Sequence, residues 1–192
     1  RGAGNLLGAN QSGFAQAVGF DTYQRLLERQ VRRMRGEEDE STAPATQVNV
    51  EGEAYLPDEY IAGADQKMNL YRRISRLQDT AELDVVEDEL LDRFGPIPPA
   101  ASRLLASVRL RLVGTRLGVE WLRVSETDAR MNFGPDSVPR LALLRDALTD
   151  RQIAVEVRRT QPLSLRLVRA GVEPLLPTLV AALELLEGVP AG

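Results

Sequence analysis

The spacing of apolar residues changes close to Gly118, and that change limits what the chain can fold into. Between residues 65 and 117, apolar residues recur every three or four positions, which is typical of amphipathic helices. After Gly118, Trp121–Val124 and Ala129–Phe133 read as two strands of a hairpin around Ser125–Asp128. Helices first and strands later predict an α+β domain with a small, mainly antiparallel sheet and flanking helices.

Three helices are predicted in the first half of this domain, over residues 65–78, 79–94 and 98–117. The second has the clearest ends, because Asp79 is a candidate N-cap, Glu82 follows it as in a capping box, and Gly95-Pro96 stops the helix. Its expected buried stripe consists of Leu83, Val86, Leu90 and Phe94.

The remaining elements complete the expected domain. Thr46–Glu51 alternates like a strand ahead of the helices. Beyond the hairpin, we expect helices over residues 137–148 and 173–186, and strands over residues 153–158 and 163–168 joined by a turn that contains Pro162.

The first 44 residues differ in composition from the rest. Residues 1–36 start as a glycine-rich loop, continue as a predicted helix over residues 20–35, and carry an excess of arginine. Residues 37–44 are acidic and poor in apolar side chains, which is typical of a solvated linker. We therefore expect a tail over residues 1–36, an acidic linker over residues 37–44 and a domain over residues 45–192.

Composition excludes several kinds of chemistry. The chain has no cysteine and no histidine, which removes disulfides, thiolate metal sites and the usual general base. Its net charge of -4 argues against a chain devoted to nucleic-acid binding. No apolar run reaches the roughly 18 residues that a membrane span needs, and no secretory signal opens the chain, so we expect a cytoplasmic protein without a membrane partner.

The glycine-rich start is neither of the common phosphate-binding glycine motifs. As a whole, Arg1-Gly-Ala-Gly-Asn-Leu-Leu-Gly8 followed by Gln11-Ser-Gly13 resembles the second half of the translocation motif of RecG-type DNA helicases and bacterial transcription-repair coupling factors. Arg1 and Gln11 match the arginine and the glutamine of that motif. Residues 1–36 would then be the end of the motif and a connecting helix.

A second block of matches distinguishes the two families, because RecG-type helicases lack the C-terminal domain that it resembles. The matching strings follow the order of that domain in the transcription-repair coupling factors, and the resemblance covers about residues 1–120. They are Tyr55–Ile61, Gln66-Lys67, Tyr71–Ile74, Glu89–Pro98, Leu110–Val113 and Leu117–Val119.

The resemblance implies a function for the intact protein. It would be an ATP-dependent double-stranded DNA translocase, with ATP and magnesium as cofactors, that displaces stalled RNA polymerase and recruits UvrA in nucleotide excision repair. The C-terminal domain would be autoinhibitory, docking on a UvrB-like N-terminal module of the same protein and masking UvrA binding. For this chain alone we expect no catalytic residue, no metal site, no cofactor and no enzymatic activity.

Two pairs of candidate functional residues follow from the resemblance. Arg1 and Gln11 would couple the nucleotide state to movement along DNA; from spacing alone, they are a loop arginine and a helix-capping glutamine. Glu89 and Asp92 match the acidic residues that contact the UvrB-like module. The alternative for this pair, and for the stripe that Asp92 forms with Asp84 and Asp88, is a solvated helix surface.

Two other functions remain open from the residues alone. The tail helix could bind DNA phosphates and make the chain a free-standing nucleic-acid-binding adaptor, although we rank an intramolecular role for it first. Its arginines are Arg25, Arg29, Arg32 and Arg33. A catalytic subunit with carboxylate chemistry is disfavoured, because no acidic pair converges with a base or a glycine-shaped pocket.

Overall fold

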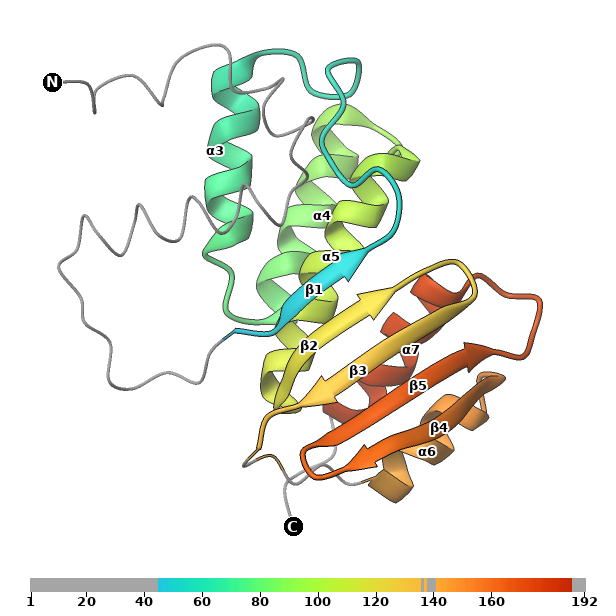
Figure 1. Cartoon of the computed structure of the whole chain (residues 1–192). Helices are drawn as coiled ribbons and strands as arrows, with labels where there is room; N and C mark the ends of the chain where they lie inside the picture. Colours follow the sequence, from blue (N-terminus) through green and yellow to red (C-terminus); the bar gives the residue numbers. More distant parts are fainter. Residues whose placement is uncertain (1–44, 136, 138–140, 188–192) are drawn as a thin grey trace, which may run out of the picture. The chain divides into compact units, whose positions relative to one another are not determined.

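The computed structural model describes residues 45–135, 137 and 141–187 (Figure 1). These residues form two compact units, a helical unit over residues 53–105 and a sheet unit over residues 45–52 and 106–187. The predicted glycine-rich loop, tail helix and acidic linker lie outside the described residues. The expected division of the whole chain into tail, linker and one domain stays a prediction.

The helical unit contains α3 (Ala64–Ser75), α4 (Thr80–Phe94) and the first part of α5 (Pro99–Arg116). The predicted N-cap is confirmed, because the backbone N–H of Glu82 donates to Oδ1 of Asp79 at 2.8 Å. The Glu82 carboxylate accepts from the backbone N–H of Gln78 at 2.8 Å, one residue before the cap. The capping box is therefore present in a shifted form.

The predicted buried stripe of α4 is confirmed for its first three members. Leu83, Val86 and Leu90 are at most 1% exposed, whereas Phe94 is only half-buried. Gly95 ends the helix with a φ of 78°, a conformation that glycine adopts without strain. The other buried apolar residues of this unit are Leu56, Ile61, Tyr71, Ile74, Leu77, Ala101, Leu104 and Leu105.

The sheet unit is built on a five-stranded sheet in the order β1-β2-β3-β5-β4 (Figure 1). Only the pairing of β1 with β2 is parallel, so the predicted α+β class with a small, mainly antiparallel sheet is confirmed. The strands are β1 (Gln47–Val50), β2 (Val119–Val124), β3 (Asp128–Phe133), β4 (Ile153–Thr160) and β5 (Leu163–Arg169). The further helices are α6 (Leu141–Thr149) and α7 (Leu175–Glu187).

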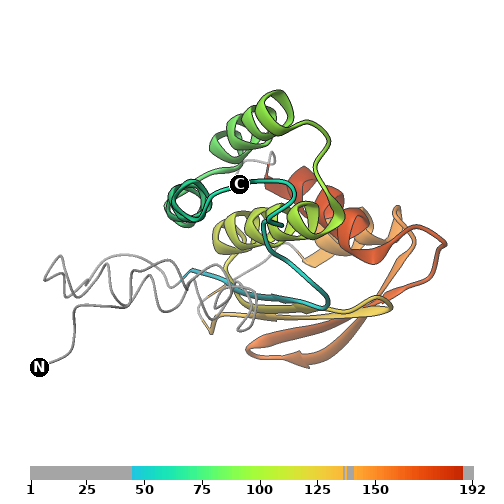
Figure 2. The same ribbon diagram turned by 90° about the horizontal axis from the view of Figure 1, so that it is seen from above.

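One face of this sheet carries the unit's core. Along β3, Ala129, Met131 and Phe133 are buried, and they join a cluster with residues of α6, α7 and the later part of α5. Figure 2 shows α5 and α7 on this side of the sheet. Because side chains alternate along a strand, the residues between them point to the opposite face. No helix of the sheet unit, within the described residues, covers that second face, which we call the open face.

The predicted start of α6 was too early. The described helix begins at Leu141, whereas Ser137 lies in a turn. The backbone N–H of Ser137 donates to the Gly134 carbonyl at 3.1 Å, and its hydroxyl donates to the Gly118 carbonyl at 2.7 Å. These bonds hold Ser137 to residues before the helix, and the partner of its hydroxyl is 19 positions away in sequence, so the local pattern gave no sign of it.

Candidate functional site

The predicted acidic residues lie on the side of α4 that faces away from the buried stripe of the helical unit. Asp92 is exposed and Glu89 is half-buried. Val85 lies on the same face, because residues 85, 89 and 92 are separated by three or four positions. Its side chain is 58% exposed, and that of Leu91 at the border of the face is 49% exposed. The face therefore combines carboxylates with exposed apolar surface, and we call it the acidic face.

Glu89 is held by two arginines of the same unit. Its carboxylate forms ion pairs with Arg73 of α3 and with Arg93, which lies one turn further along α4. The distance from Nη1 of Arg93 to Oε1 of Glu89 is 2.5 Å. Hydrogen bonds from Arg73 and then from Arg93 hold the pKa of the Glu89 carboxyl below its ordinary value. The side chain thus ties α3 to α4 at the edge of the acidic face.

Asp92 is free of such partners. No hydrogen bond or ion pair joins its side chain to another residue in the part of the chain that the structure describes. Its neighbour Arg93 binds Glu89 and also lies over the Phe94 ring, with the guanidinium carbon 5.1 Å from the ring centroid. Of the predicted pair, Asp92 is therefore the acid whose carboxylate no other described side chain binds.

Tyr60 fixes the end of α4 that presents Asp92. Its hydroxyl lies 3.1 Å from the carbonyl oxygens of Leu90 and Gly95, so it can cap the last turn of the helix. Its ring lies 5.8 Å from that of Phe94. Burial raises the pKa of the Tyr60 hydroxyl, which stays a donor at neutral pH.

Sequence reasoning missed the partners of Glu89. Arg93 could have been found, because a glutamate and an arginine four residues apart on a helix are neighbours. Arg73 could not, since it belongs to another helix and its position depends on how α3 packs against α4. The predicted motif residues Arg1 and Gln11, like the arginines of the tail helix, lie outside the described residues.

The structure offers little else for chemistry. Lys67 is 5% exposed and pairs with Asp58, and burial lowers the pKa of its amine. The cavity beside it has a volume of about 10 Å³, which is room for roughly one water. Among the described residues, no group of three or more acidic side chains could hold a metal ion. None of the described helices has the length and apolar character of a membrane span.

Comparison with known proteins gives this fold a family. The profile of the TRCF domain matches residues 50–143. The chain is 34% identical to a transcription-repair-coupling factor of Staphylococcus epidermidis over 174 residues, which is 90% of the chain and 14% of that protein. It is 39% identical to one of Staphylococcus aureus over 124 residues, which is 64% of the chain and 11% of that protein.

The curated relatives are thus much longer than this chain, which spans 14% and 11% of the two proteins. A crystal structure of the C-terminal domain of a transcription-repair coupling factor superimposes with a TM-score of 0.60 at 18% identity. That match covers 77% of this chain and 92% of the solved one, and it supports the fold. The chain belongs to the transcription-repair coupling factors and carries their TRCF domain, the C-terminal region of that family.

Proposed function

We propose that this chain is the regulatory C-terminal domain of a transcription-repair coupling factor, and that its acidic face docks on a UvrB-like N-terminal module of the same protein. In the docked state the domain masks the surface that UvrA binds. The intact protein is then a cytoplasmic, ATP- and magnesium-dependent translocase on duplex DNA that displaces stalled RNA polymerase. Release of the domain opens the way to UvrA.

The observation that carries this proposal is the composition of the acidic face. Charged side chains alone are enough to keep a helix surface in contact with solvent. This face also exposes two apolar residues, Val85 at 58% and Leu91 at 49%. Carboxylates around apolar side chains fit a partner surface that is basic and partly apolar. The proposed module would supply that surface.

The contacts of Glu89 and Asp92 suggest unequal roles. A partner arginine can pair with Asp92 directly, whereas at Glu89 it must share or displace Arg73 and Arg93. Exposed ion pairs contribute about 0.2–1 kcal/mol each and are weakened by salt. Such modest contributions suit an interface that has to open during the repair cycle, with Asp92 as the larger contributor.

This chain is not an enzyme in the proposed account. Its lack of histidine and cysteine, together with the small cavity beside Lys67, supports this reading. We expect the purified chain to hydrolyse no ATP above the rate of buffer alone in a coupled assay. Steady turnover that survives further purification would contradict this part of the proposal.

The docking itself is tested by titrating the chain against the UvrB-like module of the same protein in a calorimeter. Asp92→Ala should weaken binding about 1.4- to 5-fold, and Glu89→Ala together with Asp92→Ala should weaken it further. A matched control removes two exposed acids of the sheet unit, Glu126→Ala and Asp150→Ala, and should stay within about twofold of the parent. Equal losses in control and test variants, or no binding by the parent, would contradict the proposal.

A further inference from the structure

We propose that the open face of the sheet is a binding surface for single-stranded nucleic acid. It carries a row of arginines across three neighbouring strands, with the tryptophan of the chain beside it. This surface belongs to the sheet unit, so the inference goes beyond the docking function proposed for the helical unit.

The row consists of Arg123, Arg130 and Arg166, on β2, β3 and β5. Register places Arg123 opposite Arg130, and Arg130 opposite Arg166. Like charges at directly opposed positions of a sheet repel one another and destabilise the pairing. Arg123 and Arg130 face each other without a carboxylate partner in the described residues, and an external anion would relieve their repulsion.

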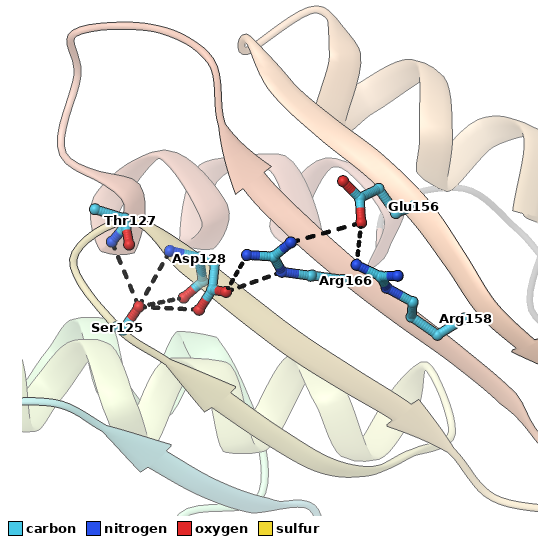
Figure 3. Close-up of polar contacts among 6 residues, drawn as sticks. All are labelled: Ser125, Thr127, Asp128, Glu156, Arg158 and Arg166. Atoms are coloured by element: carbon cyan, nitrogen blue, oxygen red, sulfur yellow. Dashed lines mark hydrogen bonds and ion pairs between the residues drawn. The ribbon is translucent and has the colours of Figure 1, made fainter.

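Arg166 is the member of the row that is neutralised within the unit. Its Nε and Nη2 each lie 2.9 Å from Oδ2 of Asp128, and its Nη1 lies 3.7 Å from Glu156 (Figure 3). The hydrogen bond from Arg166 keeps the pKa of the Asp128 carboxyl below its ordinary value. Glu156 also accepts a hydrogen bond from Arg158 at 2.5 Å.

Arg123 and Arg130 are exposed, and neither forms an ion pair with a carboxylate in the described part of the chain. Asp128 attracts Arg130 electrostatically, but the hydrogen bonds of that carboxylate go to Arg166 and Ser125. Two guanidinium groups on adjacent strands are thus available to phosphates, which they can bind bidentately.

Trp121 adds an aromatic surface to these charges. It lies two residues before Arg123 on β2, opposite Gln47 of β1 and Asn132 of β3, and it is partly exposed. The amide of Asn132 and the hydroxyl of Ser164 are 2.7 Å apart on the same face. An aromatic ring for stacking, arginines for phosphates and amides for base edges are the components of single-strand binding sites.

The same components distinguish this ligand from two others. The major groove of duplex DNA admits a helix or a two-stranded ribbon, and a sheet face that binds the minor groove must first bend and unstack the duplex. A single strand already exposes its bases and needs no such deformation. An acidic protein segment would satisfy Arg123 and Arg130 but would leave Trp121 and the amides without a role. We therefore expect an extended single strand with its phosphates on the arginine row and a base on Trp121.

The test uses the single tryptophan of the 192-residue chain as its probe. Titration with oligothymidylate should quench Trp121 fluorescence and raise the anisotropy of a labelled oligonucleotide. The double variant Arg123→Gln, Arg130→Gln should bind the oligonucleotide about tenfold more weakly than the parent. It should also reduce the slope of the logarithm of the binding constant against the logarithm of the salt concentration by about 1.4. The control with equal charge, Arg76→Gln with Arg145→Gln, should stay within about twofold of the parent. Circular dichroism checks that each variant is folded. If the double variant does not fold, the titration is made with the single variant Arg123→Gln.

Four results would overturn the inference. The first is no binding by the parent chain. The second is equal loss in the control and the test variant. In the third, a variant with glutamine at Arg25, Arg29, Arg32 and Arg33 loses binding while the sheet variant keeps it, which would assign nucleic acid to the tail helix. In the fourth, a polyglutamate peptide competes as well as the oligonucleotide, which would assign the face to an acidic protein. None of these results affects Asp92 or the docking titration.

Discussion

The two units expose faces of opposite charge. In the helical unit, the surface of α4 opposite the core carries Asp88, Glu89 and Asp92, whereas the open face of the sheet carries Arg123, Arg130 and Arg166. Both faces arise in the same way, because each element buries one side and leaves the other to solvent. A net charge of -4 therefore describes the average of the chain and says little about either surface.

The two faces also share a pattern of partial neutralisation. On α4, Glu89 is held by two arginines, and on the sheet Arg166 is held by two acids. Among the residues that the structure describes, Asp92 and Arg123 have no ion-pair partner. The held charge links neighbouring elements, and the free charges remain for partners. This comparison separates charges that serve folding from charges that serve binding, and the predicted effect of acid pH on stability tests that distinction.

The largest effects are expected from the two cores. Leu83→Ala and Leu122→Ala each remove a side chain that is 0% exposed, and each should lower the free energy of unfolding by about 2–5 kcal/mol. Urea denaturation measures the loss, and hydrogen exchange should place the weakened amides in the unit that carries the change. Leu143→Ala, at a residue that is 41% exposed, is the control and should cost less than about 1 kcal/mol.

A smaller effect is expected where α5 approaches β1 within the sheet unit. A Cβ at Gly114 would lie 2.9 Å from Cγ2 and Oγ1 of Thr46, whose hydroxyl donates to the Val119 carbonyl at 2.6 Å. Gly114→Ala should therefore cost about 1–3 kcal/mol of unfolding free energy, measured by thermal denaturation. Stability equal to that of the parent would mean that β1 does not need this close approach.

The N-cap of α4 is expected to contribute about 1 kcal/mol to the helical unit. Asp79→Ala removes the acceptor of the Glu82 N–H and should lower stability by that amount in urea denaturation. Asp79→Asn retains an acceptor and is the matched control. If both variants lose stability equally, the charge of Asp79 matters and its capping bond does not.

The smallest effects are expected from the two held acids on lowering the pH. The folded-state pKa values of Glu89 and Asp128 lie below their unfolded values, so each acid stabilises the fold above its unfolded pKa and loses that contribution as pH falls through its folded pKa. Glu89→Gln and Asp128→Asn should each flatten the acid limb of stability against pH. An acid limb as steep as that of the parent in both variants would contradict the stabilising role of these two carboxylates.

Much of this fold could be predicted because its signals are local. Asp79, Gly95 and Gly118 mark helix ends by capping chemistry, and the alternation in β3 identifies its buried face. The place of Ser137 outside α6 could not be predicted, since its hydroxyl binds the carbonyl of the distant Gly118. Local patterns thus determine the elements, and contacts between distant residues determine some of their ends.

The candidate sites divide along the same line. Glu89 and Asp92 could be nominated from a short string on one helix, and the structure places both on its exposed side. The arginine row could not be found from the sequence. The spacing of Arg123, Arg130 and Arg166 along the chain does not indicate that strand pairing places them opposite one another. Strand pairing brings these residues together, and it is a property of the sheet as a whole.

The central claim, that the acidic face holds the domain closed over the UvrA surface, is tested most directly by titrating the intact protein with UvrA. If the closed state predominates, loss of two exposed ion pairs in the Glu89→Ala, Asp92→Ala variant should raise the apparent UvrA affinity by about 2- to 30-fold. The Glu126→Ala, Asp150→Ala control should bind UvrA as the parent does. A folded Glu89→Ala, Asp92→Ala variant that binds UvrA no better than the parent would contradict the claim and return the acidic face to an ordinary solvated helix surface.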